Sequence, residues 1–126
     1  MLILGFTGTI AVSAQEVKIP TIRKANLSSK KATIRTFFLA ALNNKPEILL
    51  ECYPPKIRED MKKIAKENKM SLSEVMAKVC QNMQKAFKQQ LEKDYNGNLE
   101  KMIEDITAKN PPPLININGK WYFDIK

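Results

Sequence analysis

SLSEVMAKVCQNMQKAFKQQLEKDY, residues 71–95, is the stretch that decides the fold. Ser71 with Glu74 three residues later is the sequence pattern of a capping box, which starts a helix. Apolar side chains then recur at helical spacing for about five turns: they are Leu72, Val75, Met76, Val79, Cys80, Met83, Phe87 and Leu91. The dipeptide 96–97, Asn-Gly, is typical of a helix end. We therefore predict one long helix with an apolar face in the core.

Shorter helices are expected on both sides of this stretch. One follows Ser28 or Ser29 and runs over 32–42, and a second runs over 46–53. A third starts near Pro55 and has an apolar stripe: Ile57, Met61, Ile64 and Ala65. A last short helix follows Asn98, with Leu99, Met102, Ile103 and Ile106 on its apolar face. The sequence thus predicts an α+β fold that is mostly helical, with about five helices.

The C-terminal residues 114–125 read as a β-hairpin around Asn118-Gly119. A two-residue loop would mix apolar and polar side chains on each face. A three-residue loop would pair Ile115 with Trp121 and gather the apolar side chains on one face, namely Ile115, Trp121, Phe123 and Ile125. We therefore expect the three-residue loop, with the hairpin packed on the first helix, because an isolated hairpin is only marginally stable.

The N-terminal residues 1–14 carry no charge and end in Val12-Ser13-Ala14, a small-residue pattern typical of a signal-peptide cleavage site. This apolar stretch is too short to cross a membrane, which takes about 20 residues. We predict a signal peptide over 1–14, a loose basic leader over 15–27 and a single domain over 28–126. The mature chain would be secreted or periplasmic, without a transmembrane span. A buried first strand is the alternative interpretation of residues 1–14.

The positive charge is concentrated behind this segment. The chain has 21 Lys and Arg against 13 Asp and Glu, for a formal charge of +8. A basic patch is expected near the N-terminus, formed by Lys18, Arg23, Lys24, Lys30, Lys31 and Arg35. Such a patch can meet an anionic polymer or membrane surface, or it can simply be solvated. No aromatic residue is interleaved with these bases, so the sequence carries no specific signal for nucleic acid.

Catalytic and metal-binding signatures are missing from the sequence. There is no His, which removes the commonest general base and metal ligand. We therefore expect no catalytic residue, no metal site and no cofactor. Cys52 and Cys80 both fall on apolar helix faces. In an exported chain they could form a disulfide, and otherwise they are two buried thiols. Both alternatives stay open at this point.

Two parts of the sequence resemble a known superfamily. Residues 32–55, ATIRTFFLAALNNKPEILLECYPP, resemble the first two helices of the nuclear transport factor 2-like proteins, especially their small exported members. The ending 118–125, NGKWYFDI, is similar to that superfamily's last strand. The resemblance implies a cone of helices against a curved sheet, and a ligand-binding or scaffold role. It implies no catalytic residue for this chain, because the enzymatic members use Asp/His pairs and this sequence has no His.

Three functions from different classes follow from these observations. The first is an exported, non-catalytic binding or interaction domain, with a protein or a small apolar molecule as its partner. Its candidate ligand-binding residues are the aromatic side chains Phe37, Tyr53, Trp121 and Tyr122. The second is a small-molecule isomerase or dehydratase, for which Asp124 or Tyr122 would have to supply the polar group. The third is a cationic binder of anionic polymer or membrane surface.

Overall fold

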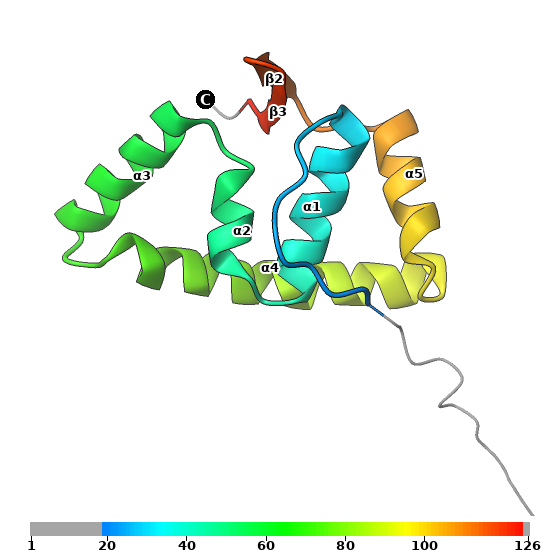
Figure 1. Cartoon of the computed structure of the whole chain (residues 1–126). Coiled ribbons are helices and arrows are strands. Elements are labelled where there is room, and N and C mark those ends of the chain that lie inside the picture. Colours follow the sequence, from blue (N-terminus) through cyan, green and yellow to red (C-terminus); the bar gives the residue numbers. More distant parts are fainter. Residues whose placement is uncertain (1–18, 125–126) are drawn as a thin grey trace, which may run out of the picture.

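The computed structural model describes residues 19–124. Five helices are followed by a two-stranded antiparallel hairpin (Figure 1). The helices are α1 (Lys30–Leu42), α2 (Pro46–Glu51), α3 (Pro55–Glu67), α4 (Leu72–Tyr95) and α5 (Leu99–Lys109), and the strands are β2 (Leu114–Ile117) and β3 (Lys120–Phe123). The prediction of a mostly helical α+β fold is confirmed. The predicted signal peptide, Lys18 and Ile125 lie outside the described residues.

Helix α4 is the longest helix and contacts each of the other four. Figure 1 shows it running along one side of the molecule, with α1, α2 and α5 rising from it. Its N-terminus has the predicted capping box, in which Ser71 and Glu74 bond to each other's backbone N–H. Its C-terminus ends at Asn96 in a left-handed conformation, with φ 50°. Both boundaries follow from local side-chain chemistry, which is why the sequence predicts them well.

Helix α1 is the centre of the fold and contacts α2, α4, α5 and β3. Ser29 caps it, with its side chain accepting the N–H of Ala32. Eight of its 13 residues are buried, including the two threonines Thr33 and Thr36. Thr33 donates to the carbonyls of Ser29 and Trp121, so its hydroxyl joins the helix to the hairpin. Burying these hydroxyls is tolerable because each has a hydrogen-bond partner.

The hairpin packs on α1 as expected, but its register differs from the prediction. The strands pair Ile117 with Lys120 and Asn116 with Trp121, so the loop has two residues. Asn118 and Gly119 both have positive φ, 53° and 86°, as a primed two-residue turn requires. Ile115 is 38% exposed, and the side chains of β3 that are buried are Tyr122 and Phe123. The predicted pairing of Ile115 with Trp121, and the predicted place of Ile115 on a buried face, are therefore wrong.

The prediction failed because it assumed that only one face of the hairpin would be covered. Tyr122 and Phe123 are neighbours in β3 and point to opposite faces, yet both are buried. The free edge of β3 is covered as well, because the N–H groups of Trp121 and Phe123 donate to the carbonyls of Leu27 and Cys52. A strand held on both faces and along its edge does not need its apolar residues on one side.

Residues 19–27 are not a loose leader. Ile19, Ile22, Ala25 and Leu27 pack against the two buried clusters of the core. Asn26 and Thr36 exchange hydrogen bonds, and the carbonyl of Pro20 accepts from the side chain of Asn43. This extended segment runs beside α1 (Figure 1). Its two basic residues, Arg23 and Lys24, are exposed and lie between Ile22 and Ala25, which contact the core.

Helix α3 is the least embedded element of the fold. Only Ala65 is buried, while Ile57 and Met61 are partly buried against the core. Ile64, predicted to lie on the apolar stripe, is 58% exposed. Figure 1 shows α3 set apart at one end of α4, where it makes its few contacts. Its apolar face is therefore wider than the surface it packs on, and Ile64 falls outside that contact.

Candidate functional site

A half-open cavity of about 620 Å³ lies against α1, α4 and α5, and the hairpin and residues 110–113 border it on further sides. Its wall is built by residues from six separate segments. They are Ile34, Phe37 and Phe38 of α1; Tyr53, which follows α2; Met83 and Gln90 of α4; Ile106 of α5; residues 110–113, Asn-Pro-Pro-Pro; and Phe123 of β3. The volume is in the range of small-molecule sites in proteins. The wall is mostly aromatic and aliphatic, as in such sites.

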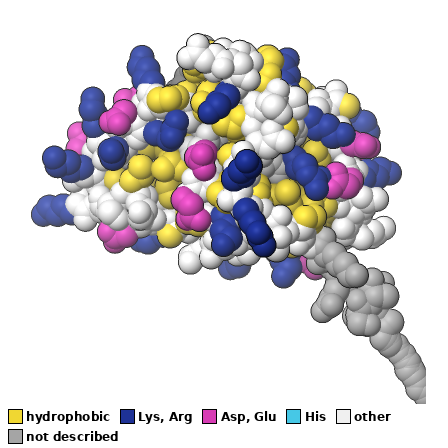
Figure 2. All heavy atoms as spheres, viewed as in Figure 1, with side chains coloured by type: hydrophobic (Ala, Val, Ile, Leu, Met, Phe, Trp, Pro, Cys, Tyr) yellow, Lys and Arg dark blue, Asp and Glu magenta, His cyan; other side chains and the backbone are white. Residues whose placement is uncertain are grey.

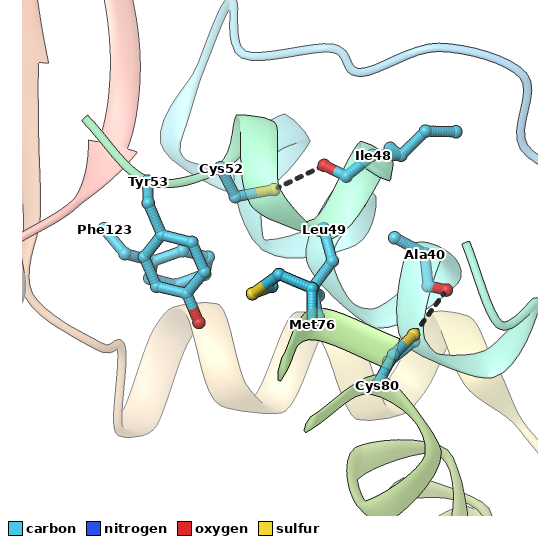
Figure 3. Packing of buried hydrophobic residues seen from close by; sticks show 9 residues of the cluster. Ala40, Ile48, Leu49, Cys52, Tyr53, Met76, Cys80 and Phe123 are labelled. Atoms are coloured by element: carbon cyan, nitrogen blue, oxygen red, sulfur yellow. Dashed lines mark hydrogen bonds between the residues drawn. The ribbon is translucent and has the colours of Figure 1, made fainter. Parts of the chain in front are cut away.

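Aromatic rings form the part of the wall around Phe37. The ring centroid of Phe37 lies 4.5 Å from that of Phe123 and 6.2 Å from that of Tyr53, both in edge-to-face geometry. Phe38 and Phe87 extend the cluster, with centroids 4.4 Å apart. Figure 3 shows Tyr53 and Phe123 side by side, one from the end of α2 and the other from β3. Edge-to-face contacts of this kind hold the rings in fixed orientations.

Three polar side chains interrupt this apolar wall. They are Tyr53, Gln90 and Asn110. Tyr53 is only 4% exposed, and burial raises its pKa to about 12, with the neighbouring Cys52 adding to the effect. Its hydroxyl therefore stays protonated at neutral pH and can donate a hydrogen bond. The two amides can each donate and accept.

The proline segment separates this cavity from a smaller neighbour. The second cavity has a volume of about 370 Å³ and shares Ile34 and the three prolines with the first. Lys30, Thr107 and Leu114 complete its wall. Proline fixes its own φ, so three in a row make a stiff partition. The carbonyl of Pro113 accepts the N–H of Asp124, which ties this segment to the end of the hairpin.

The structure brings two of the four predicted ligand-binding residues together. Phe37 and Tyr53 both line the larger cavity, whereas Trp121 and Tyr122 do not. Tyr122 is buried in packing, and Trp121 lies half-buried beneath Lys30, whose ammonium is 4.9 Å from the ring centroid. Phe123 is the hairpin residue in the wall, and it also packs against Phe37 of α1, as the sequence predicts for the apolar face of the hairpin. The stiff run 111–113 was visible in the sequence as a break but carried no sign of a cavity.

Cys52 and Cys80 are both free and buried in this structure. Each thiol points at a backbone carbonyl, Cys52 at Ile48 with 3.8 Å between sulfur and oxygen and Cys80 at Ala40 with 3.7 Å (Figure 3). Burial raises the pKa of Cys52 to about 12 and also raises the pKa of Cys80. Such thiols are poor nucleophiles, because the thiolate is the reactive form.

The predicted basic patch is partly neutralised by α5. Arg35 forms an ion pair with Glu100, and Nζ of Lys31 lies 3.9 Å from Oε2 of Glu104. Lys30 stacks on Trp121, while Arg23 and Lys24 are exposed. On the face shown in Figure 2, Lys and Arg side chains are spread across the whole width with apolar and acidic groups between them. The positive charge of the described chain is thus distributed over this face, without one dense patch.

A comparison with protein-family models, with curated proteins and with solved structures finds no match. The resemblance to the nuclear transport factor 2-like superfamily therefore stays a prediction. Within residues 19–124, no three His, Cys, Asp or Glu side chains gather into a possible metal cluster. None of the helices in the described chain is both long and apolar enough to cross a membrane.

Proposed function

We propose that the chain is a non-catalytic binding domain, exported as its N-terminus predicts, that holds a small apolar molecule in the larger cavity. The observation that carries the proposal is the wall itself. Four aromatic rings, Ile34, Met83 and Ile106 surround about 620 Å³ of space. Filling such a space with apolar atoms releases water from apolar surface, which is the main driving force for ligands of this kind.

The enzymatic alternative has less support. An isomerase or dehydratase needs a general acid or base beside the ligand. Neither Asp124 nor Tyr122, the two sequence candidates, lines the cavity. The ionisable side chain that does line it is Tyr53, and its pKa of about 12 is far from the range of an effective general base at neutral pH. A binding role makes no such demand.

The test is the binding of a neutral apolar fluorophore, N-phenyl-1-naphthylamine, to the purified chain. We expect saturable binding with one site per chain. The variant Ile106→Trp fills the cavity from α5 and should weaken binding by about tenfold or more, the effect of losing about 1.4 kcal/mol. Ile115→Trp is the matched control, because Ile115 is exposed on the hairpin and lies outside the wall.

Thermal melts of both variants separate a filled cavity from a damaged fold. The proposal predicts that Ile106→Trp stays folded and loses the probe, while Ile115→Trp keeps it. Equal binding by the wild type and by a folded Ile106→Trp variant would place the probe elsewhere and contradict the proposal. Absence of saturable binding to the wild type would contradict it as well.

A further inference from the structure

We infer that the ligand of the larger cavity is an uncharged, ring-bearing molecule with a hydrogen-bonding group, of the class of an aryl alcohol. This inference rests on the function proposed above and adds the chemical class of the ligand. It is carried by the juxtaposition of an aromatic wall, three uncharged polar side chains and no charged side chain.

The first step is the charge of the wall. The whole chain has 21 Lys and Arg and 13 Asp and Glu, yet all twelve residues that line the larger cavity are neutral. A carboxylate or an ammonium group placed there would lose its hydration without gaining an opposite charge. That loss is expensive in an apolar environment. The wall therefore selects against charged ligands.

The second step is the hydroxyl of Tyr53. It forms no hydrogen bond with another described residue, although Tyr53 is only 4% exposed. The hydroxyl oxygen is not completely enclosed by protein atoms either. Among the described residues, the only completely enclosed side-chain N or O atom without a hydrogen bond is Nε of Arg58. The hydroxyl therefore reaches open space, and the cavity is the open space that Tyr53 lines. A ligand oxygen there would accept its proton.

The third step is the position of the two amides. Gln90 and Asn110 line the same cavity, where Gln90 is half-buried and Asn110 is exposed. An amide can accept from a ligand hydroxyl and donate to a ligand oxygen, so it matches an alcohol in both directions. Neither amide is fully buried, so the penalty for leaving a polar group unpaired falls on the buried hydroxyl of Tyr53. A ligand without any polar group should consequently bind less tightly.

A cation lines the neighbouring, smaller cavity. Lys30 lines the smaller cavity, where its ammonium already stacks on Trp121. An anionic ligand that paired with Lys30 would have to draw the ammonium away from that ring. The geometry therefore favours the neutral ligand, and the anion becomes an outcome to be tested.

The experiment compares three probes of nearly the same shape, each measured by calorimetry at pH 7. They are 2-naphthol, 2-methylnaphthalene and 2-naphthoate. We expect 2-naphthol to bind about tenfold more tightly than 2-methylnaphthalene, since a hydrogen bond satisfied in a buried site has about that effect. We expect no saturable binding of 2-naphthoate.

The variant Tyr53→Phe removes the hydroxyl and keeps the ring. It should bring the affinity for 2-naphthol down to within about threefold of that for 2-methylnaphthalene. Tyr122→Phe is the matched control, since Tyr122 is also buried but does not line the cavity. It should leave all three affinities unchanged. Thermal melts confirm that both variants are folded.

The outcomes separate this inference from the proposed function. If none of the three probes binds, both are wrong. If 2-methylnaphthalene binds as tightly as 2-naphthol and Tyr53→Phe changes nothing, the cavity is an apolar site and the inference alone is wrong. If 2-naphthoate binds most tightly and Lys30→Ala abolishes that binding, the ligand is an anion and the inference is again the part that fails.

Discussion

Helices α1 and α3 have the same length, 13 residues, but α1 is deeply buried and α3 is mostly exposed. The charged and apolar residues of α3 are cleanly segregated, yet it buries only Ala65. In α1 they are less segregated, and it buries eight residues in the centre of the molecule. A helix that is surrounded has no need of one apolar stripe. Segregation along a helix therefore shows which side can be buried, and it does not show how deeply.

The hairpin packs on α1, and we expect the largest loss of stability when its buried residue Phe123 is truncated. Phe123→Ala should cost about 3–5 kcal/mol, because the ring is buried against Phe37 and a cavity would remain. Urea denaturation measures the loss. Trp121→Ala is the comparator and should cost less, since Trp121 is only half-buried. A larger loss for Trp121→Ala than for Phe123→Ala would reverse our assignment of the anchor.

The next effect tests α1 itself. Ile34 is 1% exposed and belongs to the buried cluster that α1 shares with α4 and α5. Ile34→Ala should therefore cost about 2–5 kcal/mol. The decrease in the urea midpoint gives the value, provided the slope of the transition is unchanged. A loss below about 1 kcal/mol would show that α1 is not the centre of the core.

The pH dependence of stability probes the same core at the end of α2. Burial raises the pKa of Cys52 from 9.0 to about 12 and that of Tyr53 from 10.0 to about 12. The unfolded chain loses these protons at a lower pH than the folded chain. The stability associated with keeping these two groups protonated is thus fully present below about pH 9, and it is lost as the pH rises toward 12.

We expect the melting temperature to fall between pH 9 and 11, and to fall less steeply in a Cys52→Ala variant. Melts at several alkaline pH values check this. The exposed helix α3 offers a control, because Ile64→Ala removes no titrating group and should keep the wild-type slope. Parallel slopes for Cys52→Ala and the wild type would mean that Cys52 titrates normally.

The smallest effect is expected on α3. Ile64→Ala is the same substitution as Ile34→Ala, made at a side chain that is 58% exposed. It should change the free energy of unfolding by less than about 0.5 kcal/mol. The measurement is again urea denaturation, in parallel with Ile34→Ala. If the two variants lost similar amounts, Ile64 would be covered in solution and the contrast between the two helices would disappear.

Several boundaries could be predicted because their causes are local. Ser71 and Glu74 satisfy each other's backbone groups, Pro46 and Pro55 begin helices, and Asn98 caps α5 through the N–H of Lys101. None of these interactions extends beyond a few residues, so the sequence determines them without knowledge of the rest of the chain. The predicted contact of the hairpin with α1 is also confirmed, since a hairpin needs a partner surface.

The candidate site could be predicted only in part. Phe37 and Tyr53 were proposed because they are large aromatic residues near the first two helices. Gln90 and Asn110 could not be predicted, because their place in one wall with Phe123 depends on how α4, the proline segment and β3 meet. No pattern within any of these segments signals that meeting.

The sequence by itself determined the helix boundaries to within about two residues, the position of the hairpin turn and which side of each helix can be buried. The tertiary structure decided three things that local patterns leave open. It covered both faces and one edge of β3, it packed residues 19–27 onto the core, and it left Ile64 in solvent. Helix caps and turns arise from contacts between residues close in the chain. Depth of burial, strand register and cavity walls arise from contacts between distant segments, and the assembled chain alone establishes those.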